Sequence, residues 1–443
     1  ETEPAAPLPA LTRLQWLLLI VLAAVQFTHI VDFMIVMPLG PLLEKAPEQH
    51  GFGLNHEQFS YIVAAYAVSA AIAGLLAAFF MDRFDRKRLL SCLYTGFVFG
   101  TGLCALAPNY PMLLLGRVVA GAFGGVGASA TLVIVGDRFA EARRGTAMGV
   151  LMSAFSVASI VGVPVGLLVA DVFVYWQAPF AALAGLGVLI LVLMQVVLPP
   201  LPRPAGAAPV GFWSILARYR TVLVHPGHLV AYLFMMVLVL GSFTVGAFTP
   251  DFLVKNVGMD NWALILVYVC GGAATLWTLT WFGRMSDRFG KPLMFRVLAA
   301  LTVAPLVLVT NLPAGLALPL VLGATTLMFI LTSGRMVPAM ALITACAEPH
   351  QRGSFMSINS AVQQLALGLA AVIGGAMMGE TATKALTGYA TVGWFSVGMT
   401  LLSVLMIGLL RPASSGGAAV AVETPVVEPE AAPVAEVATA PAD

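Results

Sequence analysis

Twelve apolar segments dominate this sequence, and each is long enough to cross a lipid bilayer as a helix. A spanning helix needs roughly 20 mainly apolar residues. Because lipid offers the backbone no hydrogen-bond partners, such segments must satisfy their own N–H and C=O groups, as helices do. The sequence therefore predicts an all-α membrane protein with transmembrane helices near residues 16–39, 58–80, 89–107, 110–136, 146–170, 177–198, 227–250, 262–283, 293–311, 315–345, 354–378 and 388–410.

The composition agrees with a membrane environment and excludes several classes of function. Only 10% of the 443 residues are charged, whereas soluble domains carry roughly a quarter. The net charge of +1 provides no basic field for nucleic acid. The four cysteines lie in apolar stretches without metal-ligand spacing, which indicates small buried side chains. We therefore expect no metal, no cofactor and no catalytic residues.

The segments form two sets of six, separated by the longest internal polar stretch. This spacing predicts two pseudo-symmetric six-helix bundles. The leader is rich in Pro and Ala, and the C-terminal segment lacks the periodicity of a folded element, so we expect the latter to be disordered. The predicted divisions are a cytoplasmic leader, an N-terminal bundle, a cytoplasmic central loop, a C-terminal bundle and a cytoplasmic tail, at residues 1–15, 16–198, 199–226, 227–411 and 412–443.

The basic residues predict the orientation of the chain. With an even number of spans, both termini and every second connection share one side of the membrane. Of the 22 Lys and Arg residues, 17 fall on that side. The opposite connections hold Lys45, Lys255 and Lys384, and Arg117 and Arg335 lie inside spans. Because cytoplasmic loops are enriched in Lys and Arg, we expect a multi-pass protein of the cell (inner) membrane with both termini in the cytoplasm.

Two short motifs recur at nearly the same offset. Asp82–Phe84 recurs 205 residues later as Asp287–Phe289, and the segment 144–148 (R-G-T-A-M) is echoed 208 residues later at 352–356 (R-G-S-F-M). Two echoes at nearly one offset indicate that a six-span unit has been duplicated, as in many transporters.

The first repeated motif resembles the cytoplasmic loop G-x-L-a-D-R-x-G-R-K of the major facilitator superfamily, and the resemblance extends over residues 11–411. Ala78 and Asp85 replace the two glycines of the motif in the first copy. The resemblance implies a cytoplasmic gate formed at the matching positions of the two loops and at the second echo, namely Asp82, Arg83, Arg86, Lys87, Gly283, Asp287, Arg288, Gly290 and Arg144.

Further motifs resemble the twelve-helix drug:proton antiporters within that superfamily. Arg117 and Gly121 match an R-x-x-x-G pattern, and Gly162, Pro164 and Gly166 resemble the G-P-x-x-G motif of the fifth span. Gln177 replaces the Arg of a W-R-x-x-F pattern. Small residues at this spacing are also typical of close helix packing alone.

Asp82 gives the gate a physical rationale. Its carboxylate is expected to face Arg83, Arg144 and the start of the helix near Gly353, where a negative charge is stabilised by the helix dipole and by free N–H groups. Such contacts hold the two halves together while the carrier opens outward. The alternative is a basic loop that only sets the topology.

Charges inside the predicted spans mark the candidate coupling site. Asp32 is the one acid within them, and it lies seven residues from the end of its segment. Arg117 lies seven residues from the matching end of 110–136, so both are about 10 Å deep from the same face. Charges at such depth usually mark an ion or substrate path. We expect Asp32 to carry a proton under the influence of Arg117.

Gln26, His29 and Asp32 follow one another at i, i+3 and i+6, so they share a helix face. A polar stripe facing lipid would be unsatisfied, so we expect it to face the central cavity. His29 either shares the proton or is a hydrogen-bonded structural residue.

Arg335 has no acidic partner in its own half, so it either bonds amides and carbonyls or binds an anionic group on the substrate. Gln363 is expected at about the same depth as Arg335, and other polar or aromatic side chains are further candidates for an apolar binding cavity. The predicted cavity residues are Gln26, Arg335, Asn359, Gln363, Trp277 and Phe243.

These features predict a proton-coupled secondary transporter, and more specifically an antiporter that exports a small amphipathic or drug-like solute. A transporter of a sugar or small metabolite is the alternative within transport. A membrane sensor on a transporter scaffold is the alternative of another class. Enzyme motifs and the phosphate-binding G-x-x-x-x-G-K-[ST] motif are absent from the sequence, which argues against catalysis and ATP-driven transport. The expected partners are the solute, protons and the bilayer, and the expected state is a monomer.

Overall fold

The computed structural model describes residues 12–49, 51–77, 79–81, 84–139, 141–200, 212–348, 351–381 and 385–411. Within these ranges, twelve helical segments are long and apolar enough to cross a membrane. Nine of these twelve spans are single α-helices, and the other three contain a short π-helical or 3-10 turn. The first half contains α1 (Arg13–Ile35), α3 (His56–Ala77), α4 (Arg86–Ala105), α5 (Tyr110–Arg138), α6 (Glu141–Val157), η3 (Ala158–Gly162), α7 (Val163–Phe173) and α8 (Ala178–Val197).

The second half repeats this arrangement. In the first half, α6, η3 and α7 together form one span, and in the second half α10, α11 and η4 together form one span. The elements of this half are α10 (Pro226–Gly246), α11 (Thr249–Phe252), η4 (Leu253–Val257), α12 (Asn261–Phe289), α13 (Lys291–Thr310), α14 (Leu318–Ala345), α15 (Arg352–Ala376), α16 (Tyr389–Met406) and η5 (Ile407–Leu409). The predicted all-α fold with twelve spans is confirmed.

The seventh span extends past its predicted end and brings a buried acid into the membrane. The segment expected to end at residue 250 continues through α11 and the π-helical turn η4 to Val257. Pro250 lies in the first turn of α11, where its missing N–H breaks no helical bond. The expectation that Asp32 is the one acid inside a span is therefore wrong, because Asp251 lies in this span and is 1% exposed.

The connection between the halves contains a helix where the sequence predicts a loop. Helix α9 (Phe212–Val224) lies within the expected loop 199–226 and packs against α10 and α15. It is 13 residues long, too short to register as a span. Residues 201–211 of that loop, the leader up to residue 11 and the tail 412–443 lie outside the described residues.

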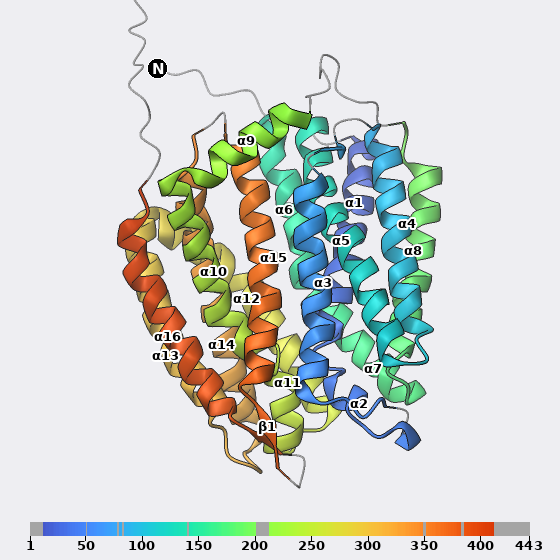
Figure 1. Ribbon diagram of the computed structural model, residues 1–443, viewed down its shortest axis with the longest axis vertical. Helices are drawn as coiled ribbons and strands as arrows, with labels where there is room; N and C mark the ends of the chain where they lie inside the picture. Colours follow the sequence, from blue (N-terminus) through green and yellow to red (C-terminus); the bar gives the residue numbers. More distant parts are fainter. Residues whose placement is uncertain are drawn as a thin grey trace, which may run out of the picture.

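The two halves lie side by side and contact each other through two pairs of helices (Figure 1). Helix α3 of the first half runs along α15 of the second, and α12 crosses the span formed by α6, η3 and α7. A Cβ atom on Gly272 would lie 2.8 Å from the Ile160 side chain, and one on Gly368 would lie 3.0 Å from Val68. The small residues therefore allow close packing between the halves.

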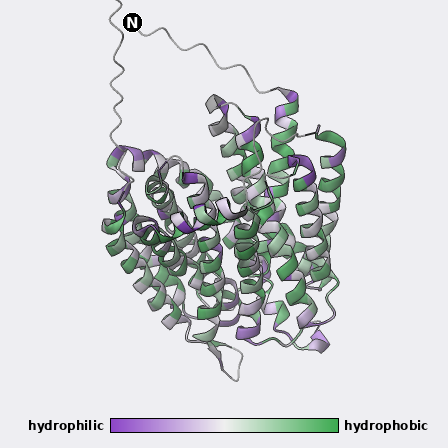
Figure 2. Ribbon diagram, turned by 45° about the horizontal axis from the view of Figure 1, so that its top comes forward, coloured by the Kyte–Doolittle hydropathy of each residue, from purple (hydrophilic) through white to green (hydrophobic). Residues whose placement is uncertain are grey.

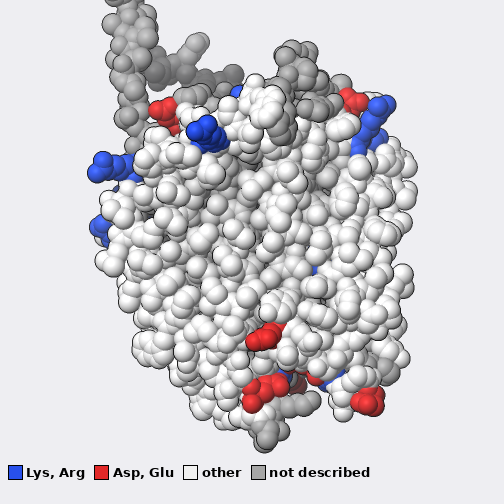
Figure 3. Space-filling model, viewed as in Figure 1, with Lys and Arg blue, Asp and Glu red and all other residues white. Residues whose placement is uncertain are grey.

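The surface is divided into an apolar middle and two polar ends. Hydrophobic residues cover the helices along most of their length (Figure 2), and the charged side chains visible in Figure 3 gather at the two ends. We call the end where α1 begins the basic end, since it holds Arg86, Arg288 and Arg352 among others. The other end, which holds Glu44, His56 and Glu380, we call the acidic end. The short elements α2 (Gly40–Leu43), η1 (Pro47–Gln49), β1 (Gly379–Glu380) and β2 (Leu386–Thr387) lie at the acidic end.

Close packing of α5 against α3 and α4 positions the candidate site. A Cβ atom on Gly121 would overlap the Tyr66 backbone oxygen and would lie 2.7 Å from Tyr66 Cα. On the neighbouring face, a Cβ on Gly100 of α4 would lie 2.8 Å from Ala120 Cα. Backbone atoms cannot move aside as a flexible side chain can, so these positions require glycine.

We expect Gly121→Ala to lower the free energy of unfolding by about 1–3 kcal/mol, because the added methyl overlaps the α3 backbone. Gly323→Ala is the matched control, since a Cβ at Gly323 of α14 meets no atom within 4 Å. Thermal unfolding of the two purified variants in the same detergent makes the comparison. Equal melting temperatures for both variants would contradict the packing described for α5.

Candidate functional site

An isolated ion pair lies inside the first half. Arg117 on α5 donates from Nη1 to Asp32 Oδ2 on α1 at 2.7 Å and to the Asp32 backbone oxygen at 3.1 Å. Thr101 on α4 donates to Asp32 Oδ1 at 3.0 Å. Both charged side chains are fully buried. Three helices thus converge on one carboxylate, and each of its oxygens accepts one hydrogen bond from a neighbouring helix.

Tyr66 on α3 completes the surroundings of Arg117. The guanidinium carbon lies 4.5 Å from the centre of the Tyr66 ring, a geometry that stabilises a cation. Among the described residues, Arg117 Nε and Nη2 have no hydrogen-bond partner. Arg117 therefore retains buried donors that a change at Asp32, or a bound molecule, can engage.

The other two members of the predicted polar stripe lie against neighbouring helices of the same half. Gln26 accepts a hydrogen bond from Thr131 on α5 at 3.2 Å. The His29 ring packs edge-on against Phe97 with centroids 4.3 Å apart, and a Cβ on Gly127 would lie 2.8 Å from it. No hydrogen bond to either ring nitrogen is present among the described residues. The stripe thus faces α4 and α5 within the bundle, which differs from the expected orientation toward a central cavity.

Both terminal nitrogens of Arg335 find hydrogen-bond partners inside the second half, while its Nε has none among the described residues. Arg335 donates to Thr400 Oγ1 on α16 at 2.8 Å, and to the Gly241 backbone oxygen at 2.8 Å and Ser242 Oγ at 2.6 Å on α10. Its side chain is fully buried. Carbonyl and hydroxyl groups therefore provide the partners that no acid of this half supplies.

The remaining predicted cavity residues lie in different environments. Phe243 on α10 stacks on Phe33 of α1 with centroids 5.7 Å apart, so this pair joins the two halves. Asn359 on α15 is fully buried, and neither end of its amide has a hydrogen-bond partner in the described part of the chain. Gln363 is half-buried on the same helix, whereas Trp277 on α12 is 81% exposed and is not enclosed by its neighbours.

The loop motifs are only partly described. Asp82, Arg83 and the side chain of Arg144, and with them the predicted gate contacts of Asp82, lie outside the described residues. Arg86 donates from Nε to Asp137 Oδ2 at 2.8 Å, and Lys87 Nζ donates to the Gln195 backbone oxygen at 2.9 Å. These contacts fasten the start of α4 to α5 and to the end of α8.

In the second copy of the loop, the backbone explains one of the glycines. Gly290 has φ +90 between α12 and α13, a conformation that L-residues with a side chain rarely adopt. The Arg288 guanidinium lies over the Phe289 ring at 5.3 Å. Gly283 and Asp287 lie in the last two turns of α12, close to that turn.

The fifth-span motif forms a tight contact with α1. Gly162 ends the π-helical turn η3, and Pro164 lies in the first turn of α7. A Cβ on Gly162 would overlap Val31, and one on Gly166 would lie 2.6 Å from the end of Ile35. The motif therefore brings the fifth span close to the helix that carries Asp32. The π-helical turn before Pro164 lies where the proline removes a backbone N–H donor from the span.

A second charged cluster, which sequence reasoning did not find, joins the two halves at the acidic end. Lys255 Nζ contacts Glu44 and lies 2.9 Å from Glu380 Oε1 and 3.4 Å from Asp251 Oδ2. His56 Nδ1 lies 3.0 Å from Glu44 Oε1. Glu44 and His56 belong to the first half, and the other three belong to the second. Asp251 and Lys255 are four residues apart in one span, but Glu44, His56 and Glu380 come from separate parts of the chain, so no local pattern brings these three to that pair.

Part of this cluster has the composition of a metal site. One ligand atom each of Glu44, His56 and Glu380 lies within 4.8 Å of the other two. However, the Lys255 ammonium contacts both glutamates, so a cation of the protein itself already occupies the position between them.

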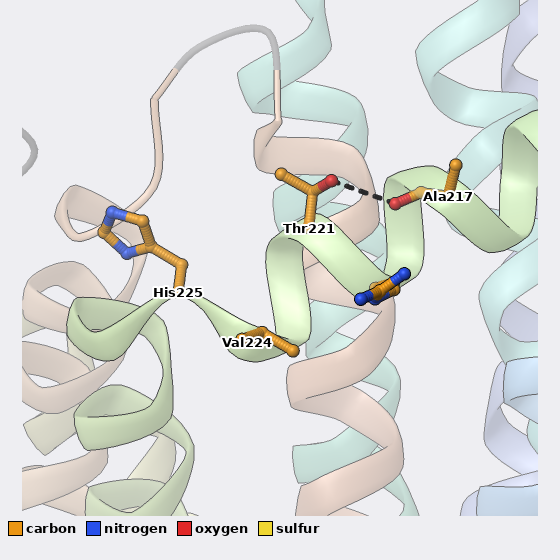
Figure 4. A pocket seen from close by; sticks show the side chains of 5 residues that line it. Ala217, Thr221, Val224 and His225 are labelled. Carbon is orange, nitrogen blue, oxygen red and sulfur yellow. Dashed lines mark hydrogen bonds between the residues drawn. The ribbon is translucent and has the colours of Figure 1, made fainter.

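A hollow on the surface of α9 lies apart from both charged clusters. It is lined by one face of that helix, and Figure 4 shows Thr221 bonded back to the Ala217 backbone oxygen. Its lining residues are Ala217, Arg220, Thr221, Val224 and His225. It contains none of the buried charges, so we do not place the functional site there.

Residues 22–334 match the family model described as Major Facilitator Superfamily. The chain belongs to the major facilitator superfamily. It is 25% identical over 367 residues to the uncharacterized MFS-type transporter YbcL of Bacillus subtilis (strain 168), covering 82% of this chain and 90% of that protein. Membership of this family and the similarity to this relative show that the chain is a membrane transporter and not an enzyme.

Solved structures show the same fold. A bacterial homolog of the human lysosomal transporter Spinster, in an inward-facing and unoccupied conformation, matches 92% of this chain and all of its own, with a TM-score of 0.68 at 15% identity. The nucleoside transporter NupG matches 90% of this chain and all of its own, with a TM-score of 0.72 at 12% identity. At these identities the likeness concerns the fold alone.

The buried ion pair predicts a strong energetic coupling between Asp32 and Arg117. We expect Arg117→Leu to lower the free energy of unfolding by about 3–5 kcal/mol, because it leaves a buried carboxylate without its cation. Adding Asp32→Asn should restore part of that loss, since no uncompensated charge then remains. Thermal unfolding of the two single variants and the double variant completes the cycle. Arg296→Leu, which removes an exposed arginine, is the control. Purely additive losses would contradict the coupling.

Proposed function

We propose that this transporter is a proton-coupled secondary carrier, and specifically an antiporter that exports a small amphipathic or drug-like solute while protons move inward. The observation that carries the proposal is the fully buried pair of Asp32 and Arg117. Charges inside the membrane are unfavourable, and where they occur they usually belong to an ion or substrate path. A carboxylate can gain and lose a proton there, which an arginine cannot.

The geometry supports two alternative states of Asp32. When ionised, the carboxylate is bound by Arg117 and Thr101 from two different helices. When protonated, it no longer balances the Arg117 charge, and the guanidinium must find other acceptors. Since α1, α4 and α5 meet at this carboxylate, the change alters contacts among three helices of the first half. Binding of a proton can thus bias the arrangement of helices on which alternating access depends.

The contact between the halves favours an amphipathic solute. Phe33 and Phe243 stack across it, and Tyr66 lies 5.5 Å from Phe33 between that stack and Arg117. Aromatic faces bind apolar and cationic groups well. Arg335 already donates to three acceptors of its own half, which argues against a role in binding an anionic solute.

The orientation belongs to the same proposal. Basic side chains gather at the end where α1 begins, and Figure 3 shows the acidic side chains of the opposite end. Under the positive-inside rule, the basic end faces the cytoplasm and the acidic end faces outward from the cell (inner) membrane.

We expect Asp32→Asn to abolish uphill transport driven by a pH gradient and to spare downhill exchange, because the amide cannot bind and release the coupling proton. The solute is the compound that most raises the melting temperature in a screen of drugs, sugars and metabolites, and its flux is measured in proteoliposomes. Glu48→Gln, at an exposed acid of η1 outside the spans, makes the same chemical change, is the control and should retain coupling. Uphill flux by Asp32→Asn would refute the proton-carrier role.

Phe243 tests the solute class independently. We expect Phe243→Ala to weaken binding of the same compound about tenfold, which is about 1.4 kcal/mol, because one face of the aromatic contact is lost. Titration of the thermal shift with the compound gives the dissociation constants. Phe99→Ala removes an exposed aromatic ring on α4 and should leave them unchanged. An unchanged constant in Phe243→Ala would place the solute away from this stack.

A further inference from the structure

The charged cluster at the acidic end is assembled from both halves and is largely buried. Glu44 follows α2 and His56 begins α3, whereas Asp251, Lys255 and Glu380 come from α11, η4 and β1 of the second half. Glu44 is 8% exposed, His56 5% and Asp251 1%. The cluster therefore exists in this form only while the two halves are closed over the acidic end.

His56 is held between carboxylates on both sides of its ring. Nδ1 lies 3.0 Å from Glu44 Oε1 and 3.7 Å from Asp251 Oδ2, and Nε2 lies 3.3 Å from Glu380 Oε1. A neutral imidazole has one N–H donor, whereas an imidazolium has two. Carboxylates accept hydrogen bonds and donate none when ionised. Only the protonated ring can donate toward the carboxylates on both of its sides.

The charge balance of the cluster points the same way. Three carboxyl groups, those of Glu44, Asp251 and Glu380, surround the single ammonium of Lys255, so negative charge remains in excess even when the buried Asp251 holds a proton. Among the described residues, Glu44, Asp251 and Glu380 lie within 3.7 Å of the His56 ring, and Lys255 is the cation that contacts all three of these carboxyl groups. Uncompensated charge is unfavourable in a buried site, so a positive charge on His56 stabilises the closed arrangement.

We propose that His56 is a second proton-binding site of this transporter, completed only when the two halves close over the acidic end. The first-half pair of Glu44 and His56 remains together when that end opens, but Asp251, Lys255 and Glu380 move away with the second half. The ring then loses the carboxylate of Glu380 beside Nε2. A proton is therefore bound more tightly in the closed state, and acidification on the outer side favours closure.

This inference uses the two-halved carrier and the orientation of the proposed function, but it does not need Asp32 to carry the coupling proton. The His56 site differs from a site inside one half, because the side chains around the ring come from two halves that separate when the acidic end opens. Linkage sets the size of the effect, since one proton bound per closure changes the closed-to-open ratio by up to about tenfold per pH unit.

The test measures the opening of the acidic end in the full chain, without solute. Spin labels are placed on Gln49→Cys of η1 and Ala314→Cys of the loop after α13, two exposed positions on opposite halves. The four native cysteines are replaced by alanine or serine. Distance distributions are recorded in lipid nanodiscs between pH 5 and pH 8, with EDTA present so that a divalent cation cannot produce the effect.

We expect the short-distance population to grow as the pH falls, and His56→Gln to remove at least half of that pH dependence. His225→Gln makes the same chemical change at an exposed histidine between α9 and α10 and should keep the full dependence. Glu380→Gln removes the negative charge beside Nε2 and should also weaken the pH dependence, which provides a second test if His56→Gln folds poorly. A wild-type pH dependence in either His56→Gln or Glu380→Gln would overturn the proposal.

Asp32→Asn separates this inference from the proposed function. Under the proposal, this variant opens and closes with the wild-type pH dependence, whatever its transport activity. If Asp32→Asn loses the dependence while His56→Gln keeps it, the proton that favours closure is bound at Asp32, and the second site does not exist. If Asp32→Asn transports uphill while His56→Gln loses the dependence, the proposed coupling residue is wrong and the second site stands.

Discussion

A polar group inside a bilayer has no water to bind, so each one must find its partners within the protein. The buried charges of this transporter meet that constraint in different ways. Asp32 and Arg117 satisfy each other, with help from Thr101 and the Tyr66 ring. Arg335 uses hydroxyl and carbonyl groups of α10 and α16. Small residues such as Gly121 serve the same constraint. They let the helices approach closely enough for short polar side chains such as those of Asp32 and Thr101 to reach each other.

The sequence predicts the fold well, since a run of about 20 apolar residues has one stable form in lipid. It also predicts that Asp32 and Arg117 lie at one depth, because rise per residue converts position into depth. The direction in which Gln26 and His29 point could not be deduced, since helix periodicity tells which residues share a face and not which neighbour that face meets. The acidic-end cluster does not follow from the sequence pattern, because Asp251 and Lys255 lie just beyond the expected end of their span at residue 250, and Glu44, His56 and Glu380 reach them from distant parts of the chain.

The contacts between the halves differ along the length of the molecule. In the spans, small residues such as Gly272 and Gly368 bring α12 against η3 and α15 against α3 without polar contacts of their own. At the acidic end, polar side chains cross the same boundary, including Asn261 to Asp171 at 2.8 Å and Lys255 to Glu44. Apolar surfaces that slide or separate in lipid lose little, because lipid tails replace the contacts. The polar contacts at the acidic end need a defined geometry, so they favour one relative position of the two halves when that end is closed.

The two charged clusters are suited to different steps for a geometric reason. Asp32, Thr101 and Arg117 all belong to the first half, so movement of one half against the other leaves their contacts in place. A proton there changes the interior of a bundle. Glu44 and His56 face Asp251, Lys255 and Glu380 across the boundary, so the same movement makes or breaks that cluster. Under the two proposals, a proton bound at His56 acts on whether the acidic end is closed, whereas a proton bound at Asp32 acts in whichever state the halves adopt. A carrier that uses both sites can bind its coupling proton in one place and respond to the pH at the acidic end in another.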